Sequence, residues 1–200
     1  MKTNFLNLKT MKTIKFYAMS IITIGMLASC SSDDSTPEEI EDEEAITGLT
    51  LTFTNQADSN NSVVLNWNDA NEDGVVDAGE QTVVGEFESS AVYNAEIELF
   101  NLDENILEED ILADQQSIDA HFFVYGTTLD FDMQRAANDE TRSDMNKLGV
   151  NTVWTAGAAG TGNISIELYH LSPNVSDSNG FGTAEGDDTD IDITFSAVIN

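Results

Sequence analysis

The 200-residue sequence has few basic residues, cysteines and prolines, and each shortage excludes a class of protein. Seven Lys and Arg face 37 Asp and Glu, a net charge of −30, so the chain lacks the positive surface that binds nucleic-acid phosphates. One cysteine excludes a disulfide scaffold and any metal site built from several thiolates. Two prolines exclude a proline-rich chain. The hydrophobic fraction of 40% is enough for a packed core and too high for an acidic disordered chain.

The first 29 residues differ from the rest because they hold four of the seven basic residues and no acidic one. An apolar run over residues 16–28 follows the lysines and leads into the sequence LASC, which ends at Cys30. A basic segment, a short apolar stretch and small residues at its end are typical of a secretion signal, and the stretch is too short to span a bilayer. We therefore expect residues 1–29 to be a signal peptide.

The segment that follows, residues 30–44, is rich in Ser, Asp and Glu, and we expect it to be a disordered acidic tether. The LASC sequence resembles the bacterial lipobox, whose cysteine is acylated and becomes the mature N-terminus. With the acidic residues after Cys30, residues 16–200 resemble small surface lipoproteins of Bacteroidota, a group that implies no defined activity. The resemblance implies an outer-membrane protein anchored through lipid on Cys30. It favours exposure at the cell surface, with the periplasmic face as the alternative.

Residues 45–200 show the alternation of apolar and polar side chains that is typical of β-strands. The clearest case is 191–199, where every second residue is apolar. Because a strand with one apolar face needs a second sheet to cover it, we expect one antiparallel β-sandwich domain of eight or nine strands, immunoglobulin-like or jelly-roll-like. A β-barrel is the alternative. The expected strands cover residues 49–54, 63–67, 83–87, 93–99, 121–125, 129–133, 150–155, 164–169 and 191–199, and only 103–116 has the spacing of one short helix or turn.

One loop carries a metal-binding pattern. Residues 69–80 match D-x-[DN]-x-[DN]-G-x5-E, the spacing that lets alternate side chains of a curled loop present oxygen atoms to Ca²⁺. The expected ligands are the side chains of Asp69, Asn71, Asp73, Asp77 and Glu80 and the carbonyl of Val75. Since crowded carboxylates repel one another unless a cation lies among them, we expect structural Ca²⁺ here.

The loop resembles that of an EF-hand, but the resemblance covers only these 12 residues. Its flanks have the pattern of strands where an EF-hand has helices, so a helix-opening switch is not expected, and the exiting helix that normally brings the residue at the position of Glu80 to the ion is missing. In an EF-hand the residue at the position of Val76 packs into the core. The alternative is an acidic turn without metal.

The other candidate sites are weaker. His121 and His170 have no cysteine partner and no H-x-x-x-H spacing, so a zinc or catalytic role is not expected for them. Arg135, Arg142 and Lys147 are interspersed with acidic residues, which predicts local ion pairs on an exposed segment. The connection over residues 171–189 is expected to be a solvated loop rather than a second cation site.

No catalytic residues are identified, because the sequence has no serine nucleophile elbow and no glycine-rich phosphate loop. We therefore expect a non-enzymatic, membrane-anchored binding or interaction module of the cell envelope, with a protein or glycan ligand and no nucleic acid. A glycan-binding accessory of a polysaccharide uptake system would need exposed aromatic residues such as Tyr169, whereas Trp67 and Trp154 are expected in the core. A carboxylate-based hydrolase would need two carboxyl groups with opposed pKa values in a cleft.

Overall fold

A computed structural model describes residues 46–71, 73, 75–77, 79–186 and 188–200. The expected signal peptide, the lipidation site Cys30 and the whole of the expected tether lie outside these residues. All of the β-domain expected from residue 45 onward, apart from residue 45 itself and four isolated positions, falls within them.

The larger sheet is antiparallel and has the strand order β3-β2-β1-β4-β8-β7, with β5 added on β4. Its strands alternate buried and exposed residues, as the sequence predicts. In β4, Tyr93, Ala95, Ile97 and Leu99 are buried while the residues between them face solvent. The strands are β1 (Gly48–Asn55), β2 (Ser62–Asn68), β3 (Gln81–Val84), β4 (Val92–Asn101), β5 (Glu104–Asn105), β7 (Phe131–Arg135) and β8 (Asn151–Ala156).

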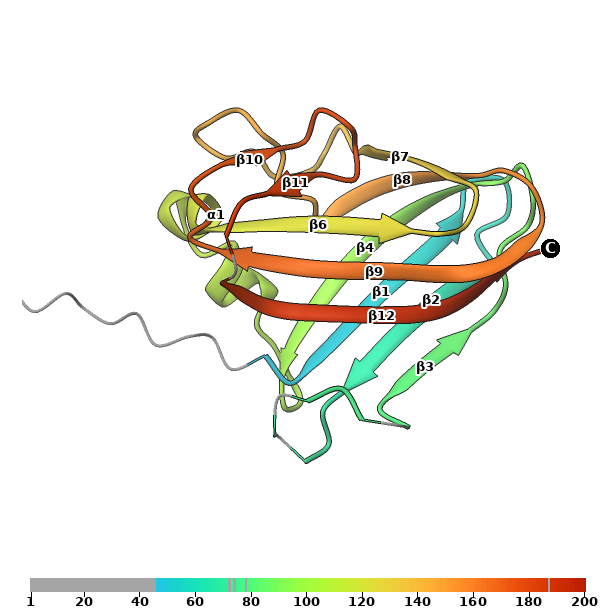
Figure 1. The fold of residues 1–200 in the computed structure, drawn as a ribbon, viewed down its shortest axis with the longest axis horizontal. Coiled ribbons are helices and arrows are strands. Elements are labelled where there is room, and N and C mark those ends of the chain that lie inside the picture. Colours follow the sequence, from blue (N-terminus) through green and yellow to red (C-terminus); the bar gives the residue numbers. More distant parts are fainter. Residues whose placement is uncertain (1–45, 72, 74, 78, 187) are drawn as a thin grey trace, which may run out of the picture. The chain divides into compact units, whose positions relative to one another are not determined.

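The smaller sheet contains β6 (His121–Thr127), β9 (Gly160–His170) and β12 (Thr189–Ile199) in the order β12-β9-β6, again antiparallel. Figure 1 shows these three strands lying across the strands of the larger sheet. Between β9 and β12 the chain forms a small hairpin of β10 (Val175–Ser176) and β11 (Thr183–Ala184). The connection expected to be a solvated loop therefore contains ordered pairing.

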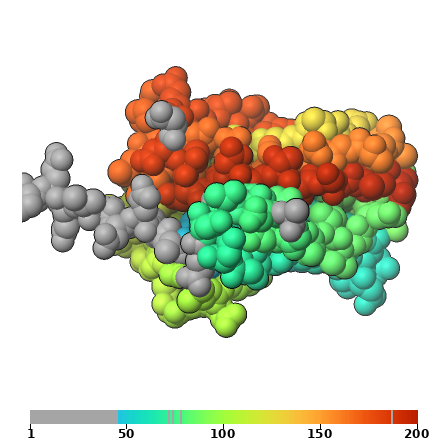
Figure 2. Space-filling view, turned by 60° about the horizontal axis from the view of Figure 1, so that its bottom comes forward, coloured from blue at the N-terminus to red at the C-terminus, as the bar shows by residue number. Residues whose placement is uncertain are grey.

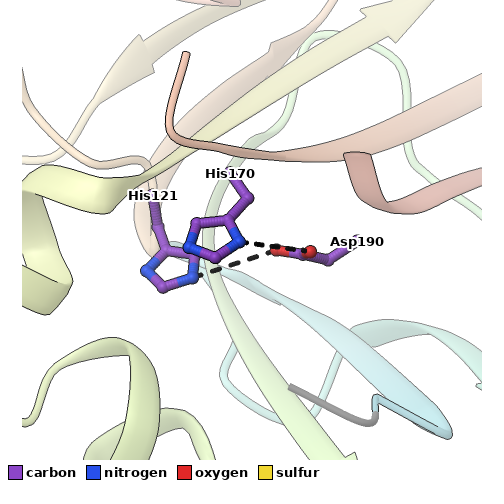
Figure 3. Close-up of side chains that lie close together, drawn as sticks. All are labelled: His121, His170 and Asp190. Carbon is purple, nitrogen blue, oxygen red and sulfur yellow. Dashed lines mark ion pairs between the residues drawn. The ribbon is translucent and has the colours of Figure 1, made fainter. Parts of the chain in front are cut away.

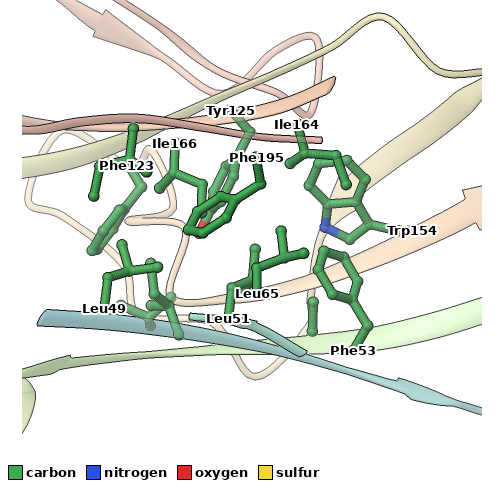
Figure 4. Packing of buried hydrophobic residues seen from close by; sticks show 14 of the residues in the cluster. Leu49, Leu51, Phe53, Leu65, Phe123, Tyr125, Trp154, Ile164, Ile166 and Phe195 are labelled. Atoms are coloured by element: carbon green, nitrogen blue, oxygen red, sulfur yellow. The ribbon is translucent and has the colours of Figure 1, made fainter. Parts of the chain in front are cut away.

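The core fills the space between the two sheets. Figure 4 shows Leu51, Phe53 and Leu65 of the larger sheet facing Ile164 and Phe195 of the smaller one. All five side chains are buried. In the described part of the chain the two sheets remain separate layers, which confirms the expected antiparallel sandwich over its closed alternative.

Two short helices connect β5 to β6, a π-helical turn η1 (Leu107–Ile111) and α1 (Gln115–Ala120). The side chain of Asp114 caps α1 by accepting hydrogen bonds from the backbone N–H groups of Gln116 and Ser117. One short helix or turn was expected within 103–116, so the helical character is confirmed but α1 continues to Ala120. Neither helix has the length and apolar composition needed to cross a bilayer.

The strand expected at 83–87 ends early, because β3 stops at Val84 and the chain then leaves the larger sheet. Gly85 has a φ of 91°, a left-handed conformation that glycine adopts without steric cost. Beyond it Phe87 forms a parallel bridge with Ile199 at the edge of β12. Figure 2 shows the green segment that contains β3 lying directly along the red β12. The segment after β3 therefore joins the two sheets along one edge.

Candidate functional site

The expected calcium loop joins β2 to β3 at one end of the larger sheet. Its base is closed by backbone hydrogen bonds, from Asn68 N–H to the Glu80 carbonyl at 3.0 Å and from Asp69 N–H to the Thr47 carbonyl at 2.8 Å. Both flanks are strands, as the sequence predicts. Residues 72, 74 and 78 of the loop lie outside the described chain.

Four of the expected calcium ligands lie close together in the loop. Asp69 Oδ1 accepts a hydrogen bond from Asp73 N–H at 3.3 Å. The side-chain amide of Asn71 donates to Asp73 Oδ2 at 3.0 Å and to Asp77 Oδ2 at 3.4 Å. Asp73 Oδ1 also accepts from Val75 N–H at 2.9 Å, which keeps the loop curled. The structure therefore brings together the side chains at the first, third, fifth and ninth loop positions.

The remaining loop residues depart from the arrangement of an EF-hand. The carboxylate of Glu80 accepts a hydrogen bond from Asp77 N–H at 2.8 Å, so it closes the turn at the end of the loop. The side chain of Val76 is 39% exposed and does not pack into the core, in contrast to the expectation from the EF-hand pattern. The reason is that the loop leads into the edge strand β3 instead of a second helix.

Arg135 is buried, and this contradicts the expectation of an exposed, ion-paired segment. Its guanidinium donates hydrogen bonds to the carbonyls of Phe123, Lys147, Gly180 and Phe181 at 2.6, 3.0, 3.1 and 3.4 Å. Only 9% of the residue is exposed. Sequence reasoning missed this role because the accepting carbonyls come from three distant segments.

Arg142 is buried as well, although it keeps one local ion pair. Its Nε lies 3.2 Å from Asp144 Oδ2, while its Nη1 donates to the carbonyls of Ile118 and His121. The third cation, Lys147, donates from Nζ to the carbonyl of Ala136. The basic residues of the domain therefore bind mostly backbone oxygens and fasten loops to the sandwich.

Asp139 is the buried acidic residue of this region. It accepts hydrogen bonds from the N–H groups of Gly149 and Asn151 at 2.8 and 2.9 Å. Burial raises the pKa of Asp139 above its ordinary value, while these two hydrogen bonds and the charge of Arg135 act in the opposite direction. The carboxylate thus holds the backbone at the start of β8.

His121, His170 and Asp190 form a second cluster of potential metal ligands, which the sequence analysis did not identify (Figure 3). The two histidines are 49 positions apart and follow no ligand spacing, so only the pairing of β6 with β9 brings them together. The nearest sequence signal was the regular alternation of β9, which continues to His170 and places it on the buried face.

The aromatic residues do not form a sugar-binding platform on the described surface. Trp67 and Trp154 are buried in the core, as expected, and Tyr169 is partly covered and donates a hydrogen bond to Glu167 at 2.8 Å. Every aromatic side chain of the described residues is buried or partly covered.

A groove of about 450 Å³ lies beside η1 and is lined by the carboxylates of Glu96, Glu98, Glu108 and Glu140. All four glutamates are exposed. A glycosidase-type pair needs one carboxyl group shielded from water, and none of these four has that environment.

Comparisons with known proteins add no assignment. No family model matches the chain, and no curated protein is significantly similar to it.

Proposed function

We propose that the chain is an exported, lipid-anchored β-sandwich that holds a structural Ca²⁺ ion in the β2–β3 loop and acts as a non-enzymatic interaction module of the cell envelope. The observation that carries the calcium part is the convergence of Asp69, Asn71, Asp73 and Asp77 in one curled loop. Asp69 is only 3% exposed, and a carboxylate withdrawn from water is stabilised by a cation that it can bind.

In this proposal Asp69, Asn71, Asp73 and Asp77 supply side-chain oxygens and Val75 supplies its carbonyl. Ca²⁺ takes six to eight oxygens, so Glu80 or water completes the shell. Glu80 must give up its hydrogen bond to Asp77 N–H in order to reach the ion. The affinity that suits an extracellular module is in the range of about 10⁻⁴ to 10⁻³ M.

The anchor in this proposal is lipid on Cys30, at the end of the signal sequence. A single acyl chain binds membranes only marginally, so at least two chains on this cysteine are needed for stable attachment. The acidic residues after it, and a net charge of −34 once residues 1–29 are removed, keep the domain away from anionic lipid headgroups. The expected location is therefore the outer membrane, with the sandwich facing outward on a tether.

The interaction part of the proposal favours a protein ligand. The outer faces of the strands carry Thr, Asn, Asp and Glu, while the large aromatic side chains that sugars stack on are directed into the core. A glycan-binding accessory remains the alternative class, and it predicts that soluble oligosaccharides raise the melting temperature of the calcium-loaded chain.

Calcium is expected to raise the melting temperature of the chain. At about ten times the dissociation constant, an ion bound only to the folded state adds about 1.4 kcal/mol, which corresponds to about 3–6 °C for a domain of this size. The measurement is a thermal melt in calcium and in chelator. The increment is expected to disappear in Asp69→Ala/Asp73→Ala.

The matched control is Asp132→Ala/Asp192→Ala, which removes the same charge from exposed strand positions. This variant should retain the calcium increment in full. Equal melting temperatures of the unmodified chain in calcium and chelator would contradict the calcium proposal.

The anchor has its own test. In a bacterial host that processes lipoproteins, the full chain is expected to fractionate with outer membranes and to incorporate labelled palmitate. Cys30→Ser should release the chain into the soluble fraction and abolish the label, because no other cysteine is present to accept an acyl group. Retention of the label in Cys30→Ser would reject the anchor.

A further inference from the structure

Two histidines meet at one end of the three-stranded sheet. His121 begins β6 and His170 ends β9, and the two residues are direct partners in the antiparallel register. Directly opposed residues project from the same face of a sheet. Alternation along β9 places His170 on the same buried face as Ile166 and Leu168. Both imidazoles therefore point into the end of the core.

Asp190 joins them because β12 has a bulge at this point. The register pairs Thr189 with Tyr169 but Ile191 with Leu168, so Asp190 is the extra residue between two consecutive pairs. An extra residue interrupts the alternation and redirects a side chain. Regular alternation would have sent Asp190 to the solvent face together with Asp192. Its side chain is instead only 4% exposed and faces the histidines.

The three side chains have the spacing of metal ligands before an ion draws them together (Figure 3). His121 Nε2 lies 3.9 Å from Asp190 Oδ2, and His170 Nδ1 lies 3.9 Å from Asp190 Oδ1. The two rings are stacked, with centroids 4.8 Å apart and planes inclined by 8°. One ligand atom from each residue lies within 4.8 Å of the other two.

The hydrogen bonding of His121 suits a metal ligand. Its Nδ1 lies 2.7 Å from the carbonyl oxygen of Ser117, which belongs to α1. A carbonyl only accepts hydrogen bonds, so Nδ1 carries a proton, and Nε2 is the ring nitrogen that faces Asp190. Histidines that bind metals usually donate their second ring N–H to a carbonyl or carboxylate in this way. The ring is thus oriented with Nε2 towards Asp190 before any ion arrives.

His170 provides the second observation. The residue is 5% exposed, and its Nε2 is buried with no hydrogen-bond partner among the described residues. Its Nδ1 is 3.9 Å from the nearest Asp190 oxygen, which is longer than a hydrogen bond. Burying a polar ring with so little compensation costs free energy. A ligand that binds the imidazole in this pocket recovers part of that cost.

We propose that His121, His170 and Asp190 bind one Zn²⁺ ion. Imidazole nitrogens suit zinc and other late transition metals, whereas Ca²⁺ and Mg²⁺ prefer shells made only of oxygen. Two histidines and one carboxylate are a common set of three protein ligands for zinc, and they leave a fourth position for water. Zn–N bonds of about 2.0–2.1 Å in a tetrahedral shell place ligand atoms about 3.3 Å apart. The two His–Asp separations of 3.9 Å must therefore contract by about 0.6 Å, and the remaining separation, which is at most 4.8 Å, by no more than about 1.5 Å.

A cavity lies beside one of the three residues. Its volume is about 410 Å³, and it is lined by His121 and Leu171 together with Asp114, Gln116, Ser117, Asp119 and Ala120. Asp114 and Asp119 lie on the wall of the same cavity, and their negative charges attract a cation towards the histidines. The site differs from the β2–β3 loop, which offers only oxygen ligands, so the two ions do not compete for one place.

The test is a titration of the chelator-treated full chain with Zn²⁺ in the presence of excess Ca²⁺. We expect one Zn²⁺ per chain at the tightest site. The zinc affinity should fall by at least about 100-fold in His170→Ala and in Asp190→Asn, because removing a residue that binds the metal directly should cost at least as much as removing a residue that only orients a ligand. Asp192→Asn, on the exposed face of β12, removes the same charge and should bind normally. Asp69→Ala/Asp73→Ala should also bind zinc normally.

A second measurement needs no variant and therefore does not depend on the mutants folding. The chain has two histidines, so nitrogen-15 NMR of the unmodified chain resolves each ring separately. One equivalent of Zn²⁺ is expected to shift the ring nitrogens of both residues together. Unchanged ring signals, or tight zinc binding that persists in both His170→Ala and Asp190→Asn, would overturn the proposal and indicate binding by surface carboxylates.

Discussion

Replacing Arg135 by alanine is expected to lower the free energy of unfolding by about 3–5 kcal/mol, because the guanidinium binds four backbone carbonyls in the interior. Each acceptor left without a partner costs on the order of 1–3 kcal/mol, reduced where water can enter. The group also lies 4.4 Å from the ring centroid of Phe122, and this cation–π contact is lost as well. Urea denaturation followed by circular dichroism measures the change.

Two variants make the result specific to the guanidinium. Gln134→Ala changes the exposed neighbour on β7 and should alter stability by less than about 0.5 kcal/mol. Arg135→Lys keeps the charge but cannot reach several carbonyls at once, so most of the loss should remain. Wild-type stability of Arg135→Lys would show that the charge, and not the set of hydrogen bonds, is what the fold requires.

Trp154→Ala is expected to destabilise the chain by about 3–5 kcal/mol through loss of the central aromatic contact. Trp154 is fully buried and packs edge-to-face against Phe53, Tyr125, Phe131 and Phe181, with ring centroids 5.4–5.8 Å apart. Since these rings come from both sheets and from the β10–β11 hairpin, the cavity would open where these three parts of the fold meet. Figure 4 shows Trp154 beside Phe53 and Ile164, between the sheets. The unfolding midpoint in urea measures the cost.

Phenylalanine substitutions at the two tryptophans provide the control. Trp154 Nε1 donates to Thr152 Oγ1 at 2.9 Å, whereas Trp67 Nε1 is buried and has no hydrogen-bond partner among the described residues. Removing an N–H that is already unsatisfied relieves a cost, so Trp67→Phe should be the milder change. If Trp67→Phe proves the more damaging of the two, then packing shape and not hydrogen bonding decides stability at these positions.

The sandwich could be predicted from the sequence because the alternation of apolar and polar residues is visible within each strand. In β1 and β12 every second residue is apolar, and the structure buries those residues in both strands. The loop at 69–80 was equally visible, since its pattern lies within 12 consecutive residues. Whether that loop binds Ca²⁺ stays a prediction.

The unpredicted features all depend on contacts between distant segments. Arg135 looked like a surface residue because charge usually indicates exposure, and nothing local shows that strand β6 and two loops converge on it. Asp190 interrupts an otherwise regular alternation, and a bulge is a property of the strand pair rather than of one strand. The two histidines become neighbours only through register. The pairing of the strands therefore decides which polar residues of this chain come together.

The contact between the segment after β3 and the end of β12, which joins the two sheets, also affects the order of folding. The backbone N–H of Asn200 donates a hydrogen bond to the Phe87 carbonyl, and the side-chain amide of Asn200 donates to the carboxylate of Glu86, 114 positions away. Contacts of such large sequence separation form late in folding, because the loop that they close costs entropy before any contact repays it. The contacts that join the two sheets therefore form only when β12 pairs with β9. Until then the unpaired edge of β9 can pair with strands of other molecules.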